Sequence, residues 1–152
     1  MNNIAPDWAH KRLRIINRVM LGLALFGILD TVHLHVQEQF GFNKGCLGFF
    51  DSAIERSFNC QEVVGSEAGS LLGLENTILG LGFFVFLSLL MFTRIYWNGR
   101  LGKLLNMSLV GILAAAFLYV SYLFYYQYAV LQEFCLLCII SAAMVTLIFI
   151  ME

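Results

Sequence analysis

Residues 134–151 read FCLLCIISAAMVTLIFIM, an apolar run without a charged side chain. Its length is close to the roughly 20 residues that a helix needs to cross the hydrocarbon core of a membrane. Three similar stretches precede it, at about 15–34, 73–93 and 104–126. The sequence therefore predicts an all-α membrane protein, a bundle of four transmembrane helices that forms a single membrane domain over residues 1–152.

The composition supports a membrane protein. Hydrophobic residues make up 60% of the chain and charged residues 12%, whereas a soluble domain is about a quarter charged. The formal net charge of -1 leaves no basic patch for nucleic acid. The first apolar stretch does not resemble a cleaved signal peptide, because it contains Asp30 and no small-residue cleavage site follows it.

The distribution of basic residues predicts the orientation. They gather around the start of the first stretch and between the second and third, at Lys11, Arg12, Arg14, Arg18, Arg94, Arg100 and Lys103. By the positive-inside rule, both termini are expected in the cytoplasm, and the segments 36–72 and 127–133 outside. All four cysteines would then lie on the periplasmic or extracellular side of the inner (cytoplasmic) membrane, where disulfides persist.

Cys135 and Cys138 form a close pair at the outer end of the last stretch. Three residues apart on a helix, they share one face and are near enough to form a disulfide. Cys135 is expected in the first helical turn, where the helix dipole favours the reactive thiolate. Cys138 is one turn deeper, nearer a lipid-soluble acceptor. The alternative is that both cysteines pack as small apolar residues.

Cys46 and Cys60 form a wide pair in the long outer loop. A segment that can move suits a shuttle, in which one thiol meets a soluble partner and the other meets Cys135. A static disulfide that braces the loop is the alternative. Zinc sites usually use two close-spaced ligand pairs, so no metal site is expected, although a non-catalytic metal-handling protein using the four cysteines stays open. The segment 47–59, which lies between Cys46 and Cys60, is predicted to form a short amphipathic helix on the membrane surface or, alternatively, an irregular loop.

Three segments resemble the vitamin K epoxide reductase (VKOR) family. They are CQEVVGSEAGSLLG at 60–73, NTILG at 76–80 and FCLLC at 134–138, and with the four-span layout the resemblance covers the chain from about residue 15 onward. The DsbB family also combines four spans, four cysteines and quinone chemistry. There the close pair precedes the wide pair, so the reversed order here favours the VKOR type.

The resemblance implies a membrane thiol–quinone oxidoreductase. It would reoxidise a separate thioredoxin-like periplasmic protein and reduce a ubiquinone, menaquinone or vitamin K type quinone held beneath the outer surface. Cys138 would contact the quinone and bond to Cys135, Cys60 would attack Cys135, and Cys46 would exchange with the partner.

Two polar residues match the quinone pocket of that family. Asn76 matches an asparagine whose amide donates to a quinone carbonyl, and Ser66 matches a serine at the pocket rim. The alternatives are that Asn76 serves helix packing and that Ser66 caps the second long helix.

One departure bears on the substrate. Vertebrate members that recycle vitamin K carry a tyrosine four residues after the second cysteine of the close pair, where this chain has Ala142. Plain quinone reduction by a bacterial-type homologue without a fused thioredoxin domain is therefore expected, with vitamin K quinone and epoxide reduction as the alternative.

Asp30 and an aromatic group complete the candidates. A carboxylate inside a span is costly, so Asp30 is expected either to relay protons or to bond a neighbouring helix. His33 and His35 are interpreted as interfacial residues. The aromatic residues at the outer end of the third stretch form an interfacial belt or a wall for the quinone; they are Tyr119, Tyr122, Phe124, Tyr125, Tyr126 and Tyr128.

Overall fold

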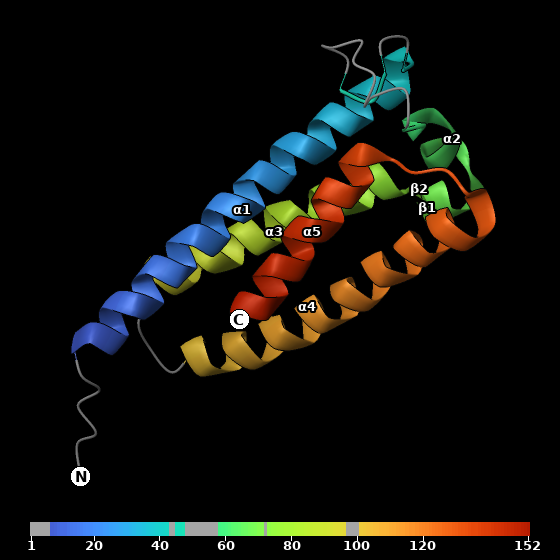
Figure 1. Ribbon diagram of the computed structural model, residues 1–152. Helices are drawn as coiled ribbons and strands as arrows, with labels where there is room; N and C mark the ends of the chain where they lie inside the picture. The colour runs from blue at the N-terminus through green and yellow to red at the C-terminus, as the bar shows by residue number, and fades with distance from the viewer. Residues whose placement is uncertain (1–6, 43–44, 48–57, 72, 97–100) are drawn as a thin grey trace.

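The structure, a computed structural model, describes residues 7–42, 45–47, 58–71, 73–96 and 101–152. Within these ranges the long helices are α1 (Asp7–Phe40), α3 (Asn76–Tyr96), α4 (Leu101–Tyr126) and α5 (Leu136–Met151). They lie alongside one another as an all-α bundle (Figure 1). The predicted fold class is confirmed.

The long helices are apolar enough to span a bilayer. The stretches Arg14–Phe40, Asn76–Ile95 and Met107–Leu131 have the length and hydropathy of membrane spans. The apolar helix Leu136–Met151 is shorter, at about 24 Å for a rise of 1.5 Å per residue. Exposed leucine and phenylalanine side chains on the outer faces of α1 and α3, such as Leu29, Phe26 and Leu89, match lipid rather than water. The chain is a multi-pass membrane protein.

The short elements gather at one end of the bundle. They are α2 (Cys60–Gly65), the 3-10 turn η2 (Glu67–Gly69), the strands β1 (Ser70–Leu71) and β2 (Leu74–Glu75), and the π-helical turn η3 (Gln127–Leu131). Figure 1 shows α2, β1 and β2 at the end where α1 finishes, opposite the end where α1 begins. These elements form a cap over the bundle.

The antiparallel hairpin of β1 and β2 determines where α3 begins. Ser70 pairs with Glu75 and Leu71 with Leu74. Gly73 turns the chain at φ +82°, a conformation that glycine adopts without steric cost. The sequence predicted a span from residue 73, but the hairpin occupies the chain up to Glu75 and the helix starts at Asn76.

The cap contains a short helix, although not over the predicted range. Residues 48–57, most of the predicted surface helix at 47–59, lie outside the described residues. The helix described in this loop is α2, which begins at Cys60 because the Asn59 side chain accepts the Glu62 N–H at 3.2 Å, an ordinary N-cap.

The core lies between the four long helices, which differ in how closely they pack. α1 packs most extensively against α3, and α5 packs against both α1 and α4, whereas α3 and α4 touch little. The central buried side chains are Met20, Ala24, Phe84, Leu87, Met91, Leu109, Leu113, Met144, Val145 and Ile148. The sparse contact between α3 and α4 leaves room for a cavity on the cap side of this core.

Candidate redox site

The wide cysteine pair is bonded and the close pair is free. Cys46 and Cys60 form a disulfide with their Cα atoms 5.5 Å apart. Cys135 and Cys138 carry free thiols. Cys46, Cys60 and Cys135 are at most 2% exposed, whereas Cys138 is only partly buried.

The cap brings the disulfide against the close pair. Cys46, Cys60 and Cys135 pack in one apolar cluster with Leu34, Val63 and Leu137, and Cys138 packs against it. The backbone N–H of Asn59 donates to the Phe134 carbonyl at 2.9 Å. Since these residues directly precede Cys60 and Cys135, the bond holds the two cysteines side by side. Thiol–disulfide exchange requires this kind of approach.

Cys135 is the N-cap of α5 rather than a residue of its first turn. Its sulfur accepts the Cys138 N–H at 3.3 Å. This N–H is one of the free donors at a helix start, where the dipole also favours negative charge. The backbone N–H of Cys135 donates to the buried Gln127 side chain at 3.1 Å. These contacts fix the Cys135 sulfur at the start of α5.

A cavity of about 390 Å³ lies beneath the cap. All four long helices, α2 and η3 contribute to its wall, which is mostly apolar. Its polar lining comes from Thr31, Ser66, Asn76, Thr77, Tyr119, Tyr126, Gln127, Cys138 and Ser141. Such a lining, apolar with a few polar groups, is typical of a small-molecule site. Cys138 lines the cavity, whereas the other three cysteines do not.

Asn76 is held at the cavity wall from two sides. The Tyr119 hydroxyl donates to its side-chain oxygen at 2.6 Å, and its amide nitrogen donates to the Ala68 carbonyl at 2.5 Å. An amide nitrogen carries two N–H groups, so one remains for a ligand. That N–H can be donated to an acceptor such as a carbonyl oxygen in the cavity.

Ser66 and Ala142 also line the cavity. The Ser66 hydroxyl donates to the Val63 carbonyl at 2.7 Å, so it closes the end of α2 and does not cap α3. Ala142 offers no hydroxyl; the hydroxyl on this part of α5 belongs to Ser141.

The family model described as "Vitamin K epoxide reductase family" matches residues 18–152. The chain belongs to the vitamin K epoxide reductase family. VKOR membership indicates an oxidoreductase that works with cysteine thiols and a quinone. No curated protein sequence matches the chain.

The sequence left open whether the aromatic residues at the end of α4 form an interfacial belt or line the cavity, and the structure shows some in each position. Tyr119, Phe124 and Tyr126 line the cavity, whereas Tyr122, Tyr125 and Tyr128 are 54 to 67% exposed. Sequence reasoning missed Gln127, which holds Cys135 and lines the same cavity. The sequence did contain a signal, because Gln127 is a polar amide between Tyr126 and Tyr128.

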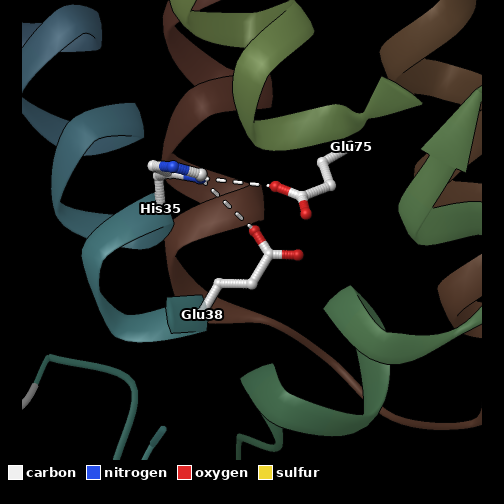
Figure 2. A group of neighbouring side chains, drawn as sticks. All are labelled: His35, Glu38 and Glu75. Carbon is white, nitrogen blue, oxygen red and sulfur yellow. Dashed lines mark ion pairs between the residues drawn. The ribbon is translucent and has the colours of Figure 1, made fainter. Parts of the chain in front are cut away.

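Two further polar groups lie near this VKOR cavity. Asp30 on α1 is 8% exposed and accepts a hydrogen bond from Ser141 on α5 at 2.5 Å, so it does bond a neighbouring helix. His35, Glu38 and Glu75 form a cluster between α1 and β2 (Figure 2). The His35 Nδ1 lies 3.8 Å from a Glu38 oxygen and 3.5 Å from a Glu75 oxygen.

The His35 cluster has the spacing of a metal site. Among the described residues, it is the group whose ligand atoms all lie within 4.8 Å of one another. Thr77 belongs to the same group of contacts, because its hydroxyl donates to Glu38 at 2.8 Å. The cluster joins the end of α1 to the start of α3.

Proposed function

We propose that this VKOR-family protein is a quinone-dependent thiol–disulfide oxidoreductase of the inner membrane. It would reoxidise a separate thioredoxin-like periplasmic protein and pass the electrons to a membrane quinone. One observation carries the proposal: the Cys46–Cys60 disulfide packs against Cys135, and its neighbour Cys138 lines an apolar cavity. The sulfurs therefore lead from the cap to a site suited to a lipid-soluble acceptor.

The first exchange takes electrons from the partner. A partner thiolate attacks Cys46, the mixed disulfide forms, and Cys60 leaves as a thiolate. The second partner thiol then attacks the mixed disulfide, so the partner becomes oxidised and Cys46 is released. The cap must shift for this step, because Cys46 is 1% exposed.

The second exchange moves the electrons inward. The Cys60 thiolate attacks Cys135 of an oxidised Cys135–Cys138 pair and releases Cys138 into the cavity. Cys46 then attacks Cys60, which restores the Cys46–Cys60 disulfide and frees Cys135. The pairing in the structure, with Cys46 bonded to Cys60 and the close pair free, corresponds to the state that follows this exchange. A bound quinone would accept two electrons and two protons from that state.

The cavity residues support a quinone as the acceptor. Asn76 keeps one amide N–H for a carbonyl oxygen, with Tyr119 fixing the orientation of the amide. Ser66 belongs to the rim. Because Ala142 supplies no hydroxyl, we expect quinones of the ubiquinone, menaquinone or vitamin K type to be reduced and the 2,3-epoxide to be reduced poorly.

The metal-handling alternative is less favoured by the same geometry. Soft metal sites use deprotonated thiolates as ligands, and two of the four sulfurs are joined to each other here.

The test uses purified protein in detergent or vesicles, a reduced thioredoxin-like donor, and either quinone or its epoxide. We expect quinol to form with the unmodified protein and not with Cys138→Ser, and little epoxide to be consumed. Epoxide turnover equal to quinone turnover would contradict the role given to Ala142. Stoichiometric bound metal without quinone reduction would contradict the proposed function.

A further inference from the structure

Asp30 occupies a position that the thiol exchanges do not explain. It lies within the apolar stretch Arg14–Phe40 and is 8% exposed. A carboxylate at such a place is costly and is usually kept for function. A helix contact alone would be served by an asparagine, which bonds across helices without an ionisable group.

The Asp30 side chain is directed toward the cavity wall through Ser141. The Ser141 hydroxyl donates to the Asp30 Oδ2 at 2.5 Å. Thr31, the neighbouring hydroxyl on α1, instead donates to the Gly27 carbonyl of its own helix at 2.8 Å. Ser141 therefore connects the Asp30 carboxylate to the cavity.

Ser141 also lies on the face of α5 that carries Cys138. It follows Cys138 by three residues on α5, so both side chains fall on one helical face, and both line the cavity. A hydroxyl that donates to Asp30 still has lone pairs to accept a proton.

We propose that Asp30 and Ser141 form a proton relay that serves Cys138 and the cavity. The Cys138 S–H gives its proton to the Ser141 oxygen while the Ser141 hydroxyl gives its own to the Asp30 carboxylate. This leaves a Cys138 thiolate, an intact serine and a protonated Asp30. The relay rests on the proposed function, since its second half delivers the proton to a quinone oxygen.

The electrons and protons balance over the whole reaction. Two thiols lose two electrons and two protons when Cys135 and Cys138 form their disulfide. The quinone takes both electrons and both protons in becoming a quinol. One proton comes from Cys135, the other is held by Asp30 in the interval, and Asp30 returns to a carboxylate.

The test compares Asp30→Asn, Ser141→Ala and the matched control Thr146→Val. Asparagine keeps the size and an acceptor oxygen but cannot take a proton. Thr146 is a hydroxyl of the same helix that donates to its own helix at 2.8 Å and is absent from the wall of the cavity.

Three measurements are made on each protein. Quinone reduction by the pre-reduced protein should fall by about a hundredfold or more in Asp30→Asn and Ser141→Ala, the usual contribution of a positioned proton-transfer group, and stay near normal in Thr146→Val. Transfer from the donor to the Cys135–Cys138 disulfide should be unchanged in all of them. Time-resolved infrared spectra should contain a transient carboxyl band during oxidation of the close pair, lost in Asp30→Asn and shifted in Ser141→Ala.

The outcomes separate the two proposals. Near-normal quinone reduction in Asp30→Asn, or the absence of the infrared band from the unmodified protein, would overturn the relay. Equal loss of thiol transfer and quinone reduction would assign Asp30 to the fold. A carboxyl band in a protein that reduces no quinone would retain the proton transfer at Asp30 and reject the proposed function.

Discussion

The two thiols of the close pair occupy different environments although they are three residues apart. Cys135 ends an extended segment that follows Gln132, a left-handed residue at φ 55°, and it lies under the disulfide. Cys138 is inside α5 and lines the cavity. The pair is therefore suited to receive electrons on one side and release them on the other.

The first prediction concerns the order of exchange. In Cys138→Ser, the Cys135 thiol can still attack Cys60 of the Cys46–Cys60 disulfide and release Cys46, while the competing bond between Cys135 and Cys138 cannot form. We expect a Cys60–Cys135 crosslink with Cys46 free, detected by peptide mapping under non-reducing conditions. A persistent Cys46–Cys60 bond with a free Cys135 would instead support a static brace.

The second prediction concerns the hydrogen bond to the quinone. Asn76→Ala removes the donor, at a cost of roughly 1–3 kcal/mol. That corresponds to a roughly five- to hundredfold fall in quinone turnover at about 1.4 kcal/mol per factor of ten. Tyr119→Phe leaves the amide but removes the hydroxyl that orients it, so a smaller fall is expected.

Two controls accompany these variants. Tyr122→Phe changes an exposed tyrosine of the same helix that is absent from the cavity wall, and its turnover should be normal. Exchange between the two cysteine pairs should survive in every variant. A matching loss of exchange in Asn76→Ala would mean that Asn76 supports the cap, through its bond to Ala68, and not the quinone.

At the scale of elements, the close fit of α1 on α3 positions the cavity wall. A Cβ built on Gly27 would lie 2.5 Å from the Phe84 ring, whereas one on Gly22 meets nothing within 4 Å. Phe84 also lines the cavity. The third prediction is that Gly27→Ala destabilises the protein by about 1–3 kcal/mol, the usual cost of overpacking, and reduces quinone binding.

Gly22→Ala is the matched control on the same helix. It should be neutral or slightly stabilising, because alanine favours a helix over glycine by about 1 kcal/mol. Thermal unfolding in detergent measures both variants. Equal midpoints for the two would contradict the importance of the contact between Gly27 and Phe84.

The sequence predicted the helices better than the cap. Long apolar runs predict an all-α membrane bundle directly, because a span needs little more than length and hydropathy. The hairpin escaped prediction because strands of two residues have no periodicity. The cavity-facing role of Tyr119, as against the exposed Tyr122, depends on how α4 is rotated in the bundle. Gln127 escaped because its role is to hold a backbone N–H of a residue that follows a π-helical turn.

At the scale of the whole molecule, the cap determines from which side of the membrane the protein would receive electrons. The fourth prediction is that Cys46 and Cys60 react with a membrane-impermeant thiol reagent in intact spheroplasts after mild reduction. Little reaction is expected before reduction, because both sulfurs are bonded and at most 2% exposed. Labelling seen only after lysis would place the cap in the cytoplasm and overturn the orientation.

The complete burial of Cys135 beneath the disulfide has a consequence for fidelity. A Cys135–Cys138 disulfide that small thiols could reach would take electrons from any of them and pass these to the quinone without oxidising the intended protein. With Cys135 at 0% exposure and Cys138 inside an apolar cavity, the inner pair is insulated from the surrounding solution. In the proposed mechanism electrons enter through the Cys46–Cys60 disulfide, so the surface near Cys46 would select the proteins that this enzyme oxidises.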